Sequence, residues 1–193
     1  IDEAWVWEHM ALTRARIIAG SPTLQARAEE IIRAVLVRPR DAEKVRADVA
    51  DMRDRIEREK GTKDIWDLKN VAGGLIDVEV VAQYLQLVPA PEHPDILHPN
   101  TAAALEKASH LGLLSQGDAE ILLPAVRLYH DLTQILRLCI ETRFVPEEAT
   151  KEFKQLLADA GTLPDFQILE AHLRDTEVAV RAAFDRIIRP TAG

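Results

Sequence analysis

Apolar residues recur at alternating intervals of four and three positions in three long segments of this chain, at 45–56, 121–139 and 169–187. This spacing places the apolar side chains in one narrow stripe along an α-helix, and such a stripe is stable when it packs against other helices. Apolar residues make up 47% of the 193 residues, which is enough for a sizeable core. We therefore predict an all-α fold: a multi-helix bundle of mostly antiparallel helices with little or no strand.

Prolines, glycines and capping residues divide the chain into about eight predicted helices. A first helix is expected from near Asp2 to Ala19, because Gly20 is a natural residue to end it. The other helices are expected to begin at residues that cap a helix or occupy its first turn: Ser21-Pro22, Asp41, Gly73-Gly74, Asn100, Ser115 or Asp118, Pro146 and Asp165.

The longest irregular stretch, 89–100, is rich in proline and is the predicted internal junction. It separates a helical region at 1–99 from a C-terminal helical bundle at 100–193, and the two form either separate domains or one. A shorter segment, from Ile65 to Lys69, alternates in polarity and is expected to be extended, with at most a trace of strand.

Acidic residues outnumber basic ones, which gives the chain a net charge of −8. Nucleic acids and anionic membranes bind surfaces with a net positive charge, so neither is expected as a partner. No apolar run is long enough to span a bilayer, and the first residues lack the basic and apolar parts of a signal peptide. The single cysteine, Cys139, cannot form an internal disulfide, which fits a reducing compartment. We therefore expect a cytoplasmic protein.

Glu8 lies at the centre of the apolar face of the first predicted helix, next to Trp7. A carboxylate in that position needs a cation or several hydrogen-bond donors, because burial without a partner is unfavourable. Arg14 and Arg16 flank the same face on its two sides. Either Glu8 joins this helix to a neighbour through an internal ion pair, or the helix lines an active-site wall that offers arginine to phosphate.

A second group of polar residues surrounds the paired glycines Gly73-Gly74. In an extended segment Asp67 and Lys69 would point the same way, and the glycines allow close backbone approach at a helix N-terminus. Polar residues interrupt the otherwise apolar helix that follows, which predicts a helix buried between layers. These residues are Asp77, Glu79, Gln83 and Gln86. The group either caps and cross-links the fold or forms an anion site.

Together the two segments resemble the glutamine synthetase adenylyltransferase family, whose members attach AMP to glutamine synthetase and remove it. Members carry two nucleotidyltransferase units, each followed by a helical region. The motifs of that region match Trp7-Glu8-x-x-Ala11-Leu12-x-Arg14-Ala15-Arg16 and Asp67-x-Lys69-x(3)-Gly73-Gly74-x-x-Asp77-x-Glu79-x(3)-Gln83 in this chain, and Asp51-Met52-Arg53 between them is also similar.

The resemblance extends from about Ala4 to Leu87 and is general beyond Asn100. The form of Trp5 to His9 is more similar to the C-terminal, adenylylating half of the family than to the deadenylylating half. Val80 departs from the pattern, since members commonly have Phe there, and this affects the expected local packing.

The catalytic centre of the family is a Gly-Ser turn followed by a pair of carboxylates that bind two metal ions and the nucleotide phosphates. The Gly-Ser here is Gly20-Ser21, which Pro22 follows, and no Asp-x-Asp pair comes after it. The resemblance therefore implies that the catalytic palm lies upstream of Ile1. Mg²⁺ and ATP are expected in the parent enzyme, and no catalytic residue, metal ligand or cofactor is expected in this chain.

The resemblance also implies roles for particular residues. Five charged residues are expected near the junction of region 1–99 with the palm, where they would face nucleotide phosphates: Arg14, Arg16, Lys69, Asp77 and Glu79. Six are expected to be structural: Trp7, Glu8, Asp67, Gly73, Gly74 and Gln83. The partners that it implies are glutamine synthetase, the PII signal protein and the nucleotidyltransferase domain of the same polypeptide.

Two other interpretations compete with this one. His130-Asp131, with His110, suggests a metal-dependent phosphohydrolase, although the further ligands of such a site are not apparent. The helices after Asn100 suggest a regulatory module that docks PII or glutamine synthetase.

Overall fold

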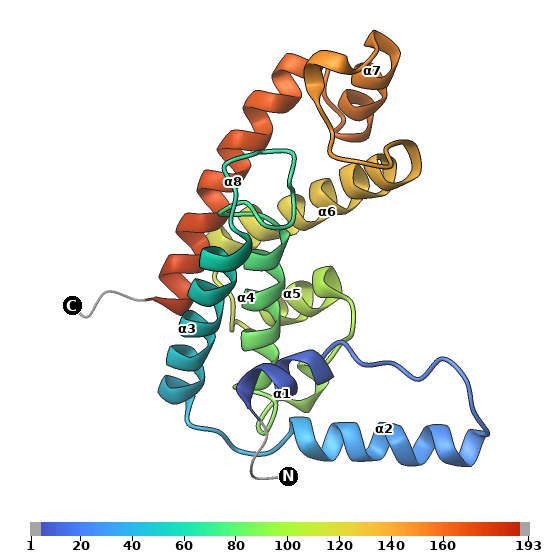
Figure 1. Cartoon of the computed structure of the whole chain (residues 1–193). Helices are drawn as coiled ribbons and strands as arrows, with labels where there is room; N and C mark the ends of the chain where they lie inside the picture. Colours follow the sequence, from blue (N-terminus) through green and yellow to red (C-terminus); the bar gives the residue numbers. More distant parts are fainter. Residues whose placement is uncertain (1–4, 190–193) are drawn as a thin grey trace.

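Polar side chains begin most of the helices at the positions where the sequence predicts caps. Ser21, Asp41, Asn100, Ser115 and Asp165 each accept a hydrogen bond from a backbone N–H in the first turn. The computed structural model describes residues 5–189. Its elements are α1 (Val6–Leu12), α2 (Pro22–Leu36), α3 (Ala42–Lys60), α4 (Leu75–Leu87), η1 (Pro94–Ile96), α5 (Thr101–His110), α6 (Gln116–Cys139), η2 (Pro146–Glu148), α7 (Lys151–Ala160) and α8 (Phe166–Ile188), where η denotes a 3-10 turn (Figure 1). The predicted all-α fold is confirmed.

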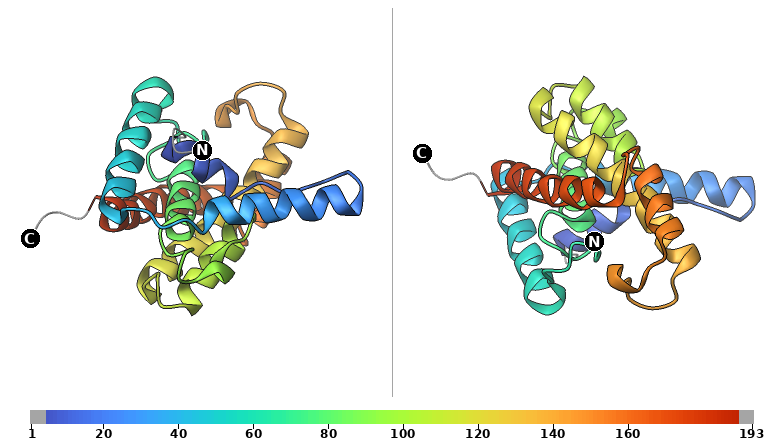
Figure 2. Two further views of the ribbon diagram at one scale, coloured as in Figure 1. Left: turned by 90° about the horizontal axis from the view of Figure 1, so that it is seen from below. Right: turned by 90° about the horizontal axis from the view of Figure 1, so that it is seen from above.

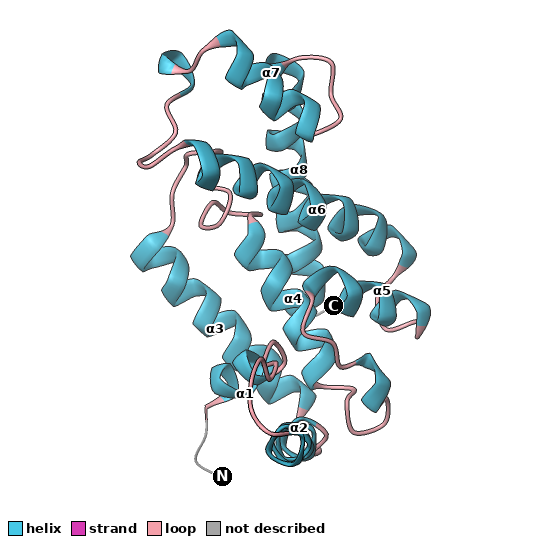
Figure 3. Ribbon diagram, turned by 90° about the vertical axis from the view of Figure 1, so that its right-hand side faces the viewer, coloured by secondary structure: helices cyan, strands magenta, loops and turns pink. Residues whose placement is uncertain are grey.

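Helix α4 is the centre of the bundle. Ten of its 13 residues are buried, and it contacts α1, α3, α5, α6 and α8. Helix α3 runs antiparallel to α4 and α8, whereas α6 crosses them obliquely (Figures 1 and 3). Apolar side chains from both sides of the 89–100 stretch, such as Val78 and Leu122, belong to one continuous core.

The first helix is shorter than the sequence predicts. Helix α1 ends at Leu12, and residues 15–18 have no regular structure. Asp2 lies outside the described residues. The Thr13 hydroxyl donates to the carbonyl of Met10 at 2.7 Å, and the Thr13 N–H donates to the same oxygen. This local bonding closes the last turn and replaces the hydrogen bonds that a longer helix would make.

Two further boundaries differ from the prediction. The segment Ile65–Lys69 forms turns rather than extended chain, and strand-like pairing within residues 5–189 is limited to one isolated bridge between Thr62 and Val71. Pro146 opens the short turn η2, and α7 begins only after the N-cap Thr150.

Helix α2 projects from the bundle (Figures 1 and 2). Its main contact is with α1, and Leu36 is its one buried residue. Leu24 and Ile31 are 64% and 56% exposed. Along residues 5–189, no helix is both long enough and apolar enough to cross a bilayer.

Candidate functional site

The loop at 61–74, which we call the motif loop, ends in a turn that requires glycine. The φ of Gly73 is 81°, in the left-handed region. A Cβ on Gly73 would lie 1.8 Å from the carbonyl oxygen of Glu177 in α8. A Cβ on Gly74 would lie 2.6 Å from the carbonyl oxygen of Leu68. The two glycines therefore allow the backbone of the motif loop to pack directly against α8 and against itself.

Asp77 is fully buried, and three donors bind its carboxylate. Its Oδ2 accepts from Gly73 N at 2.6 Å and from Arg181 at 3.4 Å, and its Oδ1 accepts from Arg53 Nε. Glu57 completes the cluster, with its Oε2 at 3.3 Å from Arg53 and 3.0 Å from Arg181. This ion-pair network joins α3, α4 and α8. The Asp77 carboxylate lies in the first turn of α4, in the interior of the protein. The geometry favours a cross-linking role for Asp77.

Glu79 faces the segment that follows α1. Its Oε1 is 2.7 Å from the guanidinium of Arg14, which remains partly exposed. Arg16 is exposed and lines a groove with residues of α2. Lys69 is exposed on the motif loop, and its carbonyl accepts from Ile76 N at 3.3 Å. The structure thus pairs Arg14 with Glu79 and leaves the side chains of Lys69 and Arg16 open to solvent.

The expected burial of Trp7 and Glu8 is wrong. Trp7 is 53% exposed, and Glu8 is only partly buried. The Glu8 carboxylate accepts from Trp5 N at 2.8 Å at the start of α1, so its partner is a backbone donor and not an internal cation. The prediction assumed a helix reaching Ala19, whereas α1 ends at Leu12 and is too short to bury a full face.

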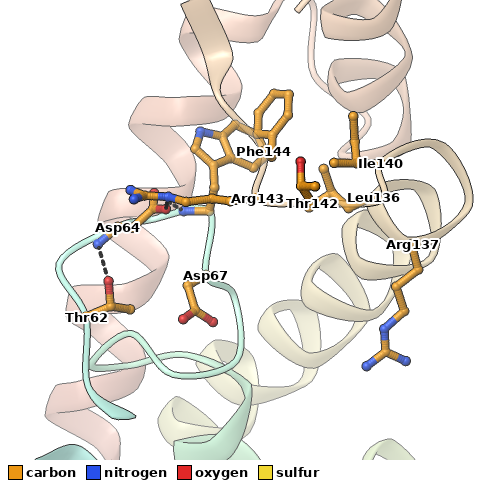
Figure 4. A pocket seen from close by; sticks show the side chains of 10 residues that line it. Thr62, Asp64, Asp67, Leu136, Arg137, Ile140, Thr142, Arg143 and Phe144 are labelled. Atoms are coloured by element: carbon orange, nitrogen blue, oxygen red, sulfur yellow. Dashed lines mark hydrogen bonds and ion pairs between the residues drawn. The ribbon is translucent and has the colours of Figure 1, made fainter. Parts of the chain in front are cut away.

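Asp67 faces a pocket of about 490 Å³ between the motif loop and the end of α6 (Figure 4). The Asn70 side-chain amide donates to Asp67 at 2.9 Å. Arg143 turns toward Asp64 and pairs with it at 2.9 Å, while Arg137 lies across the pocket from Asp67. The pocket is also bounded by an aromatic cluster in which Trp66 lies parallel to Phe166 and edge-on to Phe144, and this cluster fixes the motif loop against α8.

Three residues that hold the motif loop were not predicted as site residues: Arg53, Tyr129 and Arg181. The Tyr129 hydroxyl donates to the Gly73 carbonyl at 2.8 Å. Arg53 could have been identified from the sequence. It follows Val49 by four residues, so it places a charged side chain on the apolar face of α3. Arg181 and Tyr129 lie far from the motif in sequence, and no local pattern identifies them.

His130 and Asp131 were the residues of the alternative metal-site interpretation. Both residues lie on α6, where His130 is half-buried and Asp131 is exposed. Within the described part of the chain, no three His, Cys, Asp or Glu side chains gather as possible metal ligands. Two acidic residues at the motif loop, Asp64 and Asp77, are instead paired with arginines.

Glu177, on α8, should make the stability of the chain depend on pH. Its side chain is buried, and within residues 5–189 its Oε1 has no hydrogen-bond partner. Burial raises the pKa of Glu177 to about 7, against an opposing effect of Arg174 and with a further increase from Asp64. The folded protein therefore holds this proton more tightly than the unfolded chain. The contribution of Glu177 to stability is greatest below its pKa in the unfolded chain and is lost as the pH rises through about 7.

We expect Glu177→Gln to stabilise the chain by about 2 kcal/mol at pH 8 and to have little effect at pH 5, because glutamine carries no charge to bury. Urea unfolding at the two pH values measures this difference. Asp175→Asn is the matched control, since Asp175 is exposed on the same helix. A stabilisation by Glu177→Gln that is equal at both pH values would contradict the assignment.

A family model described as GlnD PII-uridylyltransferase matches residues 27–160, and the chain belongs to this family. It is 55% identical over 187 residues to a protein of Rhodopseudomonas palustris, 51% identical over 191 residues to one of Bradyrhizobium diazoefficiens, and 49% identical over 191 residues to one of Xanthobacter autotrophicus.

Each of these relatives is named bifunctional glutamine synthetase adenylyltransferase/adenylyl-removing enzyme. The matches cover 97% to 99% of this chain, which confirms the resemblance inferred from the two motifs and extends it past Asn100. The chain spans 19% of the length of these relatives.

Proposed function

We propose that this chain is the helical part of an enzyme that adenylylates and deadenylylates glutamine synthetase, and that it belongs to the C-terminal, adenylylating half. The observation that carries the proposal is the identity of about half of all residues, over nearly the whole chain, with relatives of that name. The proposed partners are glutamine synthetase, the PII signal protein and the nucleotidyltransferase domain of the same polypeptide. An enzyme with these partners works in the cytoplasm.

In this proposal the chemistry belongs to carboxylates elsewhere in the full-length enzyme, where Mg²⁺ and ATP bind and Mg²⁺ neutralises phosphate charge. Asp77 does not fit that role, since its carboxylate is enclosed by two arginines and a backbone N–H. The chain instead supplies cations at the domain junction. Lys69 and Arg16 are open to solvent, and Arg14 is oriented by Glu79. The buried carboxylate of Asp77 holds the motif loop in place by accepting a hydrogen bond from the Gly73 N–H.

The test uses the full-length enzyme with single changes in this chain. Lys69→Ala and Arg14→Ala should each lower the rate of adenylyl transfer to glutamine synthetase about tenfold or more, because each removes a cation near the phosphates. Both melting temperatures should stay nearly unchanged, since Lys69 is exposed and Arg14 is partly exposed. Transfer of labelled AMP from ATP measures the rate.

Lys63→Ala is the matched control, because Lys63 is also an exposed lysine of the motif loop. The isolated chain supplies the baseline and should transfer no AMP. If the loss of activity in Lys69→Ala equals that in Lys63→Ala, or follows the loss of folded protein, these residues serve the structure alone.

A second candidate role is the docking of PII or glutamine synthetase on the helices after Asn100. Exposed apolar side chains on their outer surfaces favour it: Leu138, Leu156 and Val178. Protection from hydrogen exchange at 100–189 when PII is added would support docking, and protection confined to the motif loop when nucleotide is added would oppose it.

A further inference from the structure

We propose that Tyr129, on α6, is a positioning residue that holds the motif loop in the shape that presents Lys69. This inference rests on the proposed function of Lys69. It assigns part of the site to a residue that follows Gly73 by 56 positions in the sequence and belongs to neither motif.

The first support is the way in which Gly73 is bound. Its N–H donates to the Asp77 carboxylate at 2.6 Å, and its carbonyl accepts from the Tyr129 hydroxyl at 2.8 Å. Both polar groups of this buried residue are therefore satisfied by side chains rather than by regular backbone pairing. Without the Tyr129 hydroxyl, the Gly73 carbonyl would be buried without its donor, which favours a rearranged turn.

The second support is the connection from Gly73 to Lys69. The carbonyls of Leu68 and Lys69 accept from Leu75 N and Ile76 N at 2.7 and 3.3 Å. These two bonds tie the residues just before the glycines to the first turn of α4. A rotation of the backbone at Gly73 would break this pairing, so the position of Lys69 depends on the shape of the Gly73 turn.

The third support is the protonation state of Tyr129. Burial, together with the negative charges of Glu177 and Asp77, raises the pKa of the Tyr129 phenol far above its ordinary value. The hydroxyl therefore stays protonated and donates to Gly73 throughout the pH range in which the protein would work. Because Tyr129 is fully buried, it cannot touch a substrate and must act through the loop.

The chain contains two tyrosines, and the second provides a matched control. Tyr84 is also buried, but the hydrogen bond of its hydroxyl is with Arg46 of α3, whose Nε donates to it at 3.2 Å. Tyr129→Phe and Tyr84→Phe therefore remove the same atom from two buried phenols, and only the first removes a bond to the loop.

The experiment compares these two variants in the full-length enzyme. Tyr129→Phe should speed hydrogen exchange of the amides at 67–74 and lower kcat for adenylyl transfer about tenfold, because a misplaced cation loses its alignment with the phosphates. KM for glutamine synthetase should not change. Tyr84→Phe should alter neither the exchange at 67–74 nor kcat.

Unchanged exchange at 67–74 in Tyr129→Phe would overturn the inference. So would faster exchange with an unchanged kcat, provided that Lys69→Ala lowers the rate. A normal rate in Lys69→Ala would instead overturn the proposed function, and the exchange measurement would still decide whether Tyr129 anchors the loop.

Discussion

Gly73→Ala should destabilise the chain by at least about 3 kcal/mol, the sum of a left-handed backbone for alanine and an overpacked interior. The added Cβ would lie 1.8 Å from the Glu177 carbonyl oxygen. That oxygen belongs to the backbone of α8 and cannot move as a flexible side chain would. Relief requires the motif loop to leave α8, which would also separate Gly73 from Tyr129. Urea unfolding of the purified chain measures the loss.

Gly112→Ala separates the two causes. Gly112 has a similar positive φ, 72°, but an added Cβ would meet no atom within 4 Å. It should therefore show only the backbone effect, about 1–2 kcal/mol. An equal loss in the two variants would mean that Gly73 does not pack against α8.

Asp77→Ala should be comparably damaging, with a loss of about 3–5 kcal/mol, because it leaves a buried cation without its main partner. Arg53 is fully buried, and among residues 5–189 its remaining ion-pair partner would be Glu57, at 3.3 Å. The Gly73 N–H would also lose its acceptor. The free energy of unfolding, from urea titration, should fall without a change in the helical content of the native state.

The control for Asp77→Ala is Asp51→Ala, which breaks the exposed pair between Asp51 and Arg55 on α3 and should cost less than about 0.5 kcal/mol. Adding Arg53→Met to Asp77→Ala tests the mechanism. The double variant should be more stable than the sum of the two single losses predicts, by about 1 kcal/mol or more, because the unpaired charge is removed. Strict additivity would show that Arg53 and Asp77 are not coupled.

Local signals account for most of what the sequence predicted correctly. A cap such as Asp41 or Asn100 acts on N–H groups two or three residues away, so its effect can be read within one turn. The close backbone approach at Gly73-Gly74 was predicted in the same way. The end of α1 was missed because the hydroxyl of Thr13 competes with helical bonding, and a wheel drawn through Ala19 then placed Trp7 on a buried face.

The partners of the predicted site residues could not be read locally. Asp77 is separated from Arg53 by 24 residues and from Arg181 by 104. Periodicity shows which face of a helix is apolar, but it does not show which helices meet. The sequence therefore predicted that Asp77 is important and left open whether it binds a ligand or cross-links the helices.

The projection of α2 has a thermodynamic consequence. A helix of 15 residues with one buried side chain is marginal on its own, and its melting exposes little new apolar surface. Native-state fluctuations can therefore open α2 while the rest of the bundle stays intact, so a single two-state free energy does not describe every residue. A spectroscopic probe of helix content averages the local opening of α2 and the cooperative unfolding of the bundle. The fluorescence of Trp66, which is buried in the aromatic cluster beside the motif loop, reports on the cooperative core.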